Sequence, residues 1–213
     1  MNNSLTEEQV KVLNMSQSVI NEVRKVIIGK DEIIIKVLLS ILAGGHILIE
    51  DIPGVGKTTL AVALSKALSL DYKRLQFTPD VLPTDVTGFT MLNKETHKFE
   101  YKQGAALTNL FLADEINRTS SKTQSALLEV MEEGKVTVDG ITHKMPDPYI
   151  VIATQNPVGS IGTQMLPESQ MDRFIVRLTM GYPNLESDLK SRVLARDVFV
   201  EVPLQGARFS DNF

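Results

Sequence analysis

The stretch HILIEDIPGVGKTTLAVALSKALSL, residues 46–70, constrains the fold more than any other part of the chain. A short apolar run is followed by a loop with two glycines and then by apolar residues at helical spacing. A strand, a glycine loop and a helix in this order form the local context that a phosphate-binding loop requires. Gly56-Lys57-Thr58 fits the end of the usual pattern, whereas Asp51 stands where its first glycine is expected.

The start of a helix suits a phosphate, because its backbone N–H groups point at the anion and its dipole favours negative charge. Gly54 and Gly56 let the backbone approach closely, and a proline before them stiffens the entry. Lys57 can reach the β- and γ-phosphates of a nucleotide, and the Thr58 hydroxyl can complete a Mg²⁺ coordination shell. The expected nucleotide-binding residues of the loop are Pro53, Gly54, Val55, Gly56, Lys57, Thr58 and Thr59.

Asp51 departs from the pattern, because it puts an anion at the position of the first glycine. It lies at the end of the strand, before the amides of residues 54–58 that would cradle phosphate. We therefore expect its side chain to point away from the phosphates without cost to their binding. The alternative is a glycine-rich turn that caps an ordinary helix, and the strand before the loop argues against it.

Two acidic residues follow a second apolar run, in the stretch LFLADE at residues 110–115. A carboxylate at the carboxyl end of a buried strand beside a phosphate loop can hold the water shell of Mg²⁺, which is the role expected for Asp114. Glu115 is placed to polarise a water molecule that attacks a γ-phosphate. Two acids also occur at ordinary strand ends, but the phosphate loop upstream favours the functional interpretation.

Two further polar residues adjoin apolar runs. Asn156 follows the run YIVIATQ, so its amide could hydrogen-bond the attacking water or the γ-phosphate, although an ordinary Asn-Pro turn is the alternative. Arg173 stands directly before the last run, FIVRL. It could pair locally with Asp172 or stabilise γ-phosphate charge across a subunit boundary, and the spacing alone favours the local pair.

Composition excludes several classes of function. The chain of 213 residues carries a net charge of −4 and has an isoelectric point near 5.5, which disfavours a general nucleic-acid coat. It has no cysteine, so disulfides, thiolate metal sites and thiol catalysis are excluded. The N-terminus is unlike a signal peptide, and the most apolar run, residues 33–45, is too short to span a bilayer. We expect a soluble, cytoplasmic protein without a membrane span.

Apolar runs that alternate with helical patterns indicate a parallel α/β sheet. The amphipathic stretch at residues 121–133 predicts a helix that Gly134 ends. The strands of the sheet are expected at residues 46–50, 72–77, 110–114, 149–154 and 174–178.

Two helices are expected before the first strand. Thr6 and Gln9 resemble a capping box, and apolar residues at helical spacing continue from there to Ile28. Asp31 is expected to cap the second helix, which should end at the Gly44-Gly45 pair.

Two hairpins are expected outside the sheet. FTML and FEYK flank a polar turn at residues 93–98, after a loop with room for one helical turn. KVTV and ITHK flank Asp139-Gly140, a pair that suits a type I′ turn between alternating segments.

Together these elements resemble a AAA+ ATPase and, within that superfamily, the MoxR group. The matching stretches are EDIPGVGKTTLA, FLADEINRTSSKTQSALLEVMEEGKVTVDG, YIVIATQNPVGSIGTQMLPESQMDRF and GYP, in the expected order over most of residues 29–183. A match in several motifs is far more specific than a phosphate loop alone. MoxR-type loops also tolerate a residue other than glycine at the position of Asp51.

The resemblance implies a P-loop α/β core with a parallel five-stranded sheet of order 5-1-4-3-2, flanked by helices. Residues 80–101 resemble the helix-2 insertion and residues 135–144 the pre-sensor-1 hairpin. Residues 1–183 are then the nucleotide-binding core with its N-terminal helix. Residues 184–213 contain one expected helix, 184–197, and an aperiodic tail, so the helical lid is expected to be partial or truncated, without an assigned sensor-2 arginine.

The same resemblance implies roles for single residues. Lys57 and Thr58 correspond to Walker A, Asp114 and Glu115 to Walker B, and Asn156 to sensor 1. ATP and Mg²⁺ are then the expected ligands, with Thr58 and Asp114 on the metal side and Glu115 and Asn156 in catalysis.

Arg173 matches the family's arginine finger, which replaces the local ion pair by action in trans on a neighbouring subunit. The active enzyme is then expected to be a homo-oligomeric ring, a hexamer. By family analogy it would hydrolyse ATP to remodel a partner protein, such as one with a von Willebrand factor A (VWA) domain or one that receives a metal cofactor. The alternatives are a nucleotide-gated binding module without turnover and a nucleic-acid motor akin to MCM helicases, which the Asp139-Gly140 hairpin tip disfavours.

Overall fold

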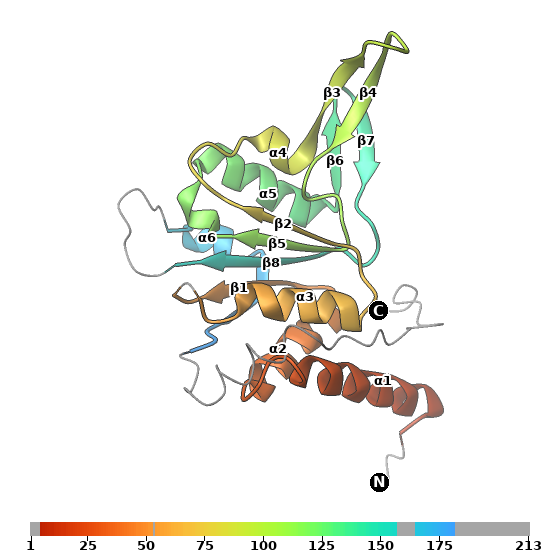
Figure 1. Ribbon diagram of the computed structural model, residues 1–213, viewed down its shortest axis with the longest axis vertical. Helices are drawn as coiled ribbons and strands as arrows, with labels where there is room; N and C mark the ends of the chain where they lie inside the picture. Colours follow the sequence, from red (N-terminus) through yellow and green to blue (C-terminus); the bar gives the residue numbers. More distant parts are fainter. Residues whose placement is uncertain (1–4, 53, 157–164, 182–213) are drawn as a thin grey trace.

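Five parallel strands form the centre of the molecule, in the order β2-β5-β8-β1-β9 (Figure 1). The computed structural model describes residues 5–52, 54–156 and 165–181. Counted along the chain, the strands of this sheet stand in the order 2-3-4-1-5, which is the predicted 5-1-4-3-2 read from the other edge. The expected P-loop α/β core is therefore confirmed. Its strands are β1 His46–Glu50, β2 Tyr72–Gln76, β5 Leu110–Asp114, β8 Ile150–Gln155 and β9 Phe174–Leu178.

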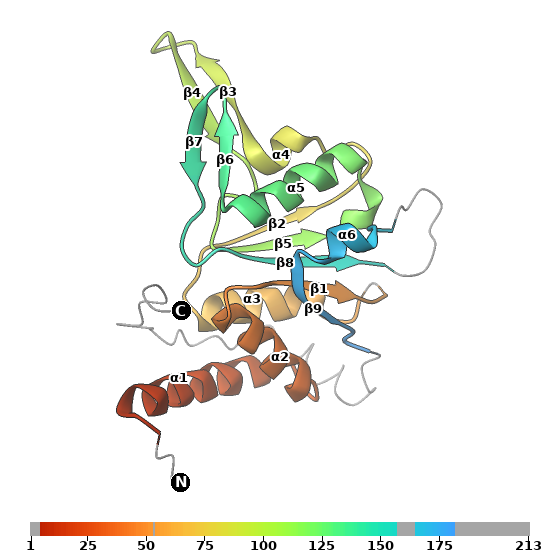
Figure 2. The same ribbon diagram turned by 180° about the vertical axis from the view of Figure 1, so that it is seen from behind.

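Helices cover both faces of the sheet, because its central strands are apolar on both sides (Figures 1 and 2). Successive residues of a strand point to opposite faces. Ile47 and Leu112 accordingly pack in one cluster, and Leu48 and Phe111 pack in another. The first cluster includes residues of α1 Glu7–Arg24, α2 Asp31–Leu42 and α3 Lys57–Ala67, and the second includes residues of α5 Ser121–Glu133.

The starts of the two N-terminal helices differ in how they are capped. The Thr6 hydroxyl accepts from the N–H of Gln9 at 3.2 Å, and the Gln9 side chain accepts from the N–H of Thr6 at 2.9 Å, which confirms the capping box. This helix ends at Arg24, short of its predicted end. The expected cap of α2 is wrong, because Lys30 holds the N-cap position and the Asp31 carboxylate instead accepts from Arg24 Nε at 2.9 Å.

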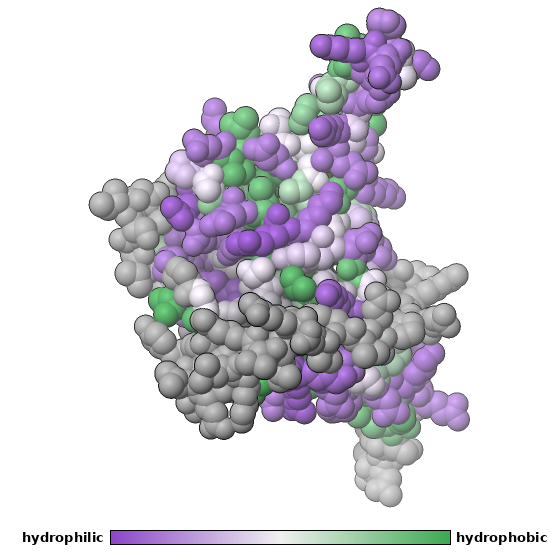
Figure 3. Space-filling view, viewed as in Figure 1, coloured by the Kyte–Doolittle hydropathy of each residue, from purple (hydrophilic) through white to green (hydrophobic). Residues whose placement is uncertain are grey.

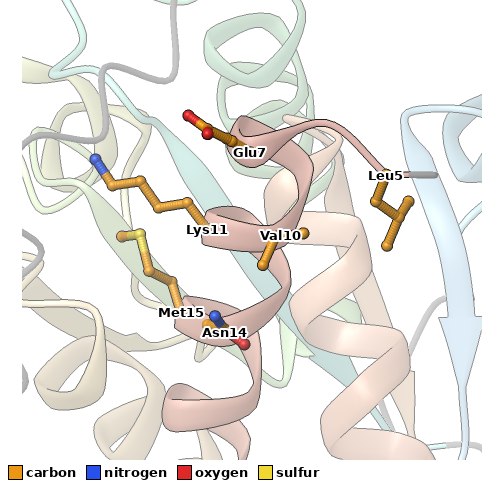
Figure 4. Close-up of a pocket in the computed structure, with 6 residues that line it drawn as sticks. All are labelled: Leu5, Glu7, Val10, Lys11, Asn14 and Met15. Carbon is orange, nitrogen blue, oxygen red and sulfur yellow. The ribbon is translucent and has the colours of Figure 1, made fainter.

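The first half of α1 extends beyond the core. The buried residues of α1, Val19 and Val23, lie in its second half, whereas Leu13 is 60% exposed. Neither this helix nor any other within the described ranges is long and apolar enough to cross a membrane. An open pocket beside the first turns of α1 is lined by Leu5, Glu7, Val10, Lys11, Asn14 and Met15 (Figure 4).

Two hairpins project side by side from the same part of the molecule (Figures 1 and 2). Asp139 and Gly140, in the turn of the second hairpin, both have positive φ angles of 50° and 80°, as expected for a type I′ turn. The helix predicted over residues 184–197 lies outside the described residues. The hairpins and the short elements are α4 Pro83–Thr87, β3 Gly88–Asn93, β4 Lys98–Gln103, η1 Ile116–Arg118, β6 Lys135–Val138, β7 Ile141–Lys144 and α6 Glu168–Met171.

An aromatic contact joins the two hairpins. Tyr101 of β4 stacks on His143 of β7, with ring centroids 3.8 Å apart and an angle of 14° between the rings. The Tyr101 hydroxyl also donates to the Thr87 carbonyl at 2.5 Å, at the base of the first hairpin. Gly104 tightens this base, because a Cβ atom there would lie 2.2 Å from the carbonyl oxygen of Val86. The two hairpins therefore share one closely packed base.

His46 is half-buried and links β1, β8 and α5. Its Nδ1 accepts from the N–H of Val151 at 3.0 Å, so the ring hydrogen lies on Nε2 and is donated to the Met131 carbonyl at 3.1 Å. Both ring nitrogens are thus hydrogen-bonded while the imidazole is neutral. Burial lowers the pKa of His46 below its ordinary value of 6.5, and the bond to Met131 acts in the opposite direction.

We expect the free energy of unfolding to fall as the pH drops below about 6.5, because the unfolded chain then binds a proton at His46 that the folded chain resists. This one group accounts for at most about 1.4 kcal/mol per pH unit. Urea unfolding at two pH values on either side of the ordinary pKa measures the loss. His46→Gln should lose less stability on acidification, and equal losses in both proteins would contradict this role of His46.

Candidate nucleotide-binding site

Three predicted segments meet at the carboxyl ends of the strands, because β1, β8 and β5 are parallel neighbours. They are the phosphate loop, the acid pair and the residue after β8. A cavity of about 330 Å³ lies at this edge. Segments that are predicted separately along the sequence thus contribute to one cavity. Its lining residues are Gly54, Gly56, Lys57, Thr58, Thr59, Arg74, Gln76, Asp114 and Glu115.

The remaining predicted residues are not in this lining. Pro53 lies outside the described residues. Val55 is 8% exposed, and its side chain anchors the loop in the hydrophobic core. Asn156 stands at the carboxyl ends of the strands, as the cavity does. Arg173 stands at the amino ends, directly before β9.

The phosphate loop adopts a conformation that depends on its glycines. Gly54 and Gly56 have φ angles of 88° and 95°, in the left-handed region that other residues rarely adopt. Gly56 is the N-cap of α3, and no side chain of the described residues caps that helix. The first amides of α3 are therefore left for an anionic ligand at the positive end of the helix dipole.

Lys57, the first residue of α3, rests on the loop itself. Its Nζ donates to the carbonyl of Asp51 at 2.7 Å and to that of Ile52 at 3.1 Å. Burial lowers the pKa of the Lys57 ammonium, while the negative charges of Asp114, Asp51 and Glu115 act in the opposite direction. Two backbone carbonyls thus hold the Lys57 ammonium. A phosphate can take their place as its hydrogen-bond acceptor, and it carries a full negative charge.

Asp114 is 8% exposed and is held from two sides. Its Oδ1 accepts from the Thr154 hydroxyl at 2.6 Å, and its Oδ2 accepts from Arg74 Nη2 at 2.7 Å and Nε at 3.2 Å. A carboxylate offers about four acceptor positions, so one on Oδ1 remains for Mg²⁺ or a metal-bound water. Asp114 and the Thr58 hydroxyl are oxygen ligands of the kind that Mg²⁺ prefers, and the residues present therefore fit this ion.

Glu115 has a strained backbone and a partner for its side chain. Its φ of 58° lies in the left-handed region, and its N–H donates to the Thr154 hydroxyl at 2.9 Å. Its carboxylate accepts from Arg118 Nη1 at 2.8 Å. The Thr154 hydroxyl therefore bonds to both members of the acid pair and fixes them relative to each other.

Asn156 is positioned by a second asparagine. Asn117 of η1 is fully buried, and its Nδ2 donates to the backbone carbonyl of Asn156 at 3.1 Å. Its Oδ1 also accepts from the N–H of Asn156 at 3.4 Å. The chain end of β8 is thus tied to the segment after the acid pair, and a sensor role for the Asn156 side chain stays a prediction.

Arg173 lies far from the cavity of its own chain. Phe174, the next residue, pairs with His46 at the start of β1, whereas the phosphate loop follows the end of that strand. Four residue steps of a strand span roughly 13 Å, more than an arginine side chain reaches. Arg173 Nη2 instead pairs with Glu132 of α5 at 2.9 Å, not with Asp172 as the spacing alone suggested.

Three residues of the site were missed by sequence reasoning. Arg74 and Gln76 belong to β2, which is expected only as a strand, and they reach the cavity because β2 lies beside β5. Thr154 carried a weak signal as the polar residue near the end of the apolar run YIVIATQ.

Comparisons with known proteins agree with this geometry. A family model described as the ATPase family associated with various cellular activities (AAA) matches residues 46–176. The uncharacterized protein YeaC of Bacillus subtilis (strain 168) is 55% identical over 170 residues, covering 80% of this chain and 53% of that protein. Chaperone MoxR1 of Mycobacterium tuberculosis (strain ATCC 25618 / H37Rv) is 42% identical over 167 residues, covering 78% of this chain and 44% of that protein.

Among solved structures, a putative ATPase from Cytophaga hutchinsonii ATCC 33406 superposes with a TM-score of 0.76. It shares 42% sequence identity, and the match covers 88% of this chain and 59% of that one. The present chain spans about half the length of the curated relatives it matches. The family match over most of the sheet and the MoxR-named relatives show that the chain belongs to the AAA family of ATPases, in its MoxR group.

Proposed function

We propose that the chain binds ATP with Mg²⁺ in the cavity at the carboxyl edge of the sheet and hydrolyses it. One observation carries this proposal: Lys57, Thr58, Asp114 and Glu115, expected from separate motifs, line the same cavity. The nucleotide-binding unit would comprise residues 1–183, with residues 184–213 as part of a lid.

Each residue has a role that follows from its contacts. Lys57 exchanges the carbonyls of Asp51 and Ile52 for the β- and γ-phosphates, while the amides of α3 face the same anion. Asp114 and Thr58 hold Mg²⁺, which when bound neutralises charge on the phosphates. Glu115 would orient the attacking water, and the Asn156 amide at the end of β8 would hydrogen-bond that water or the γ-phosphate.

Arg173 would act on a neighbouring molecule. Arg173 lies at the amino ends of the strands and cannot reach the phosphate loop of its own chain, which supports this role. A contact between two different surfaces of identical chains repeats head to tail, and it forms a closed ring if the rotation between subunits allows. We propose a homo-oligomeric ring, a hexamer by analogy with the family, in which Arg173 neutralises γ-phosphate charge in the next subunit's site.

The projecting hairpins would carry the contact with a partner protein. They expose large apolar side chains among hydrophilic ones (Figure 3), and Phe99 is 76% exposed. A relative named as a chaperone and this exposed surface support remodelling of a protein partner. A partner with a VWA domain, or one that receives a metal cofactor, rests on family analogy alone.

The test is the rate of ATP hydrolysis per mole of chain over a wide range of protein concentration. The rate should rise with concentration, because each complete site needs two chains. A rate at background with ATP still bound would favour the alternative, a nucleotide-gated binding module without turnover. Failure to bind ATP would overturn the proposal altogether.

A further inference from the structure

Asp51, the residue that breaks the phosphate-loop pattern, is buried and bonded on both carboxylate oxygens. Oδ1 accepts from the N–H of Ile52 at 2.8 Å, and Oδ2 accepts from the N–H of Gly181 at 2.7 Å. Its side chain is thus directed at the chain that leaves β9, not into the cavity. Asp51 joins the start of the phosphate loop to a residue 130 positions later.

The backbone of the same residue bonds to Lys57. The Asp51 carbonyl accepts from Lys57 Nζ at 2.7 Å, and the Asp51 N–H donates to the Gln155 carbonyl at 3.2 Å. A phosphate in the cavity competes with the Asp51 carbonyl for the Lys57 ammonium. Asp51 and Ile52 are therefore the residues that lose a hydrogen bond when Lys57 moves to a ligand.

The chain around Gly181 is packed against the loop. Met180 is 3% exposed, and its methyl group lies 3.9 Å from the point where a Cβ atom on Gly56 would sit. Lys30 Nζ donates to the Met180 carbonyl at 2.6 Å. Gly181 itself has a φ of 68°, which favours glycine. The loop and this segment are thus joined by direct contact and by the bond from Gly181 to Asp51.

We propose that Asp51 is a positioning residue that transmits nucleotide occupancy of the phosphate loop to the chain leaving the sheet at Gly181. This role presupposes the proposed nucleotide binding. The free energies are coupled in both directions, so the bond between Asp51 and Gly181 also sets how readily the loop releases Lys57. A loop with glycine at position 51 would still bind phosphate, but it would lack the bond that couples nucleotide occupancy to Gly181.

Hydrogen exchange at the Gly181 amide, resolved by NMR with and without ADP, measures this coupling. In the wild type, ADP should change the exchange rate. In Asp51→Ala the amide should exchange on the order of tenfold faster without nucleotide, because a bond to a charged acceptor is lost, and ADP should no longer change it. Fluorescent-nucleotide titration gives the ADP concentration that saturates each protein, so that exchange is compared with nucleotide bound in both.

Glu50→Gln is the matched control. Glu50 is the neighbouring buried carboxylate and contacts Arg177 of β9 and Gln155, but it does not bond to Gly181. This variant should keep the wild-type response, and Asp51→Leu, which has a similar shape but no acceptor oxygen, replaces Asp51→Ala if the latter does not fold. A wild type that binds ADP with no change at Gly181, or an Asp51 variant with an unchanged response, overturns the coupling alone. A wild type that binds no nucleotide overturns the proposed function with it.

Discussion

Glu115→Gln is expected to abolish ATP turnover while ATP binding stays close to wild type. Glutamine has the size of glutamate but neither its charge nor its basicity, so it cannot polarise the attacking water. The backbone bond from residue 115 to Thr154, and with it the position of Asp114, does not depend on the side chain. Steady-state turnover should fall by at least about 100-fold, and a fluorescent-nucleotide titration should show little change in affinity.

Glu129→Gln provides the control for this variant. Glu129 is an exposed acid of α5 outside the cavity, so the same change of charge there should leave turnover unaltered. A variant at residue 115 that loses affinity as strongly as turnover would show that Glu115 serves binding, not catalysis. The bond from Arg118 to Glu115 would then be the first contact to examine.

Arg173→Ala is expected to reduce turnover by about 1,000-fold or more and to spare nucleotide affinity. An arginine supplied across a subunit boundary stabilises charge that develops in the transition state, so its loss affects turnover, not ground-state binding. The measurement is steady-state hydrolysis at a protein concentration where the wild type is fully active. Glu132→Ala removes the partner of Arg173 within the chain and should leave the arginine available, so it should retain activity.

A mixture of the two inactive variants separates action in trans from any effect within the chain. A site with Glu115 from an Arg173→Ala subunit and Arg173 from a Glu115→Gln subunit is complete. Random assembly of equal amounts would produce such sites at about a quarter of all interfaces, provided that each interface is formed head to tail. Recovery of activity to about that level is expected, and a mixture as inactive as its components would contradict the shared site.

Features set by local sequence were predictable. The strand, glycine loop and helix from His46 onward, the Thr6 capping box and the Asp139-Gly140 turn all depend on residues a few positions apart. Asp31 shows the limit, since a good capping residue became the first helical residue once Arg24 was close enough to pair with it.

Contacts between distant strands were not predictable from a single sequence. Arg74 and Thr154 hold Asp114 only because β2, β5 and β8 are neighbours, and neither residue carries a motif. Arg173 pairs with Glu132 for the same reason, across the packing of α5 on the sheet. Lys57, Thr58, Asp114 and Glu115 were predicted and line the cavity, whereas Arg74 and Gln76 in the same lining and Thr154, which bonds to Asp114, were not predicted.

The stacked rings of Tyr101 and His143 have a mechanical consequence. The first hairpin is inserted after β2, and the second is inserted between the acid pair and the end of β8. The two hairpins, inserted before β5 and before β8, are thereby joined to each other at their base. We expect a displacement of α4 or of α5 to move both hairpins together, because α4 leads into the first hairpin, α5 leads into the second, and the stacked rings connect the two.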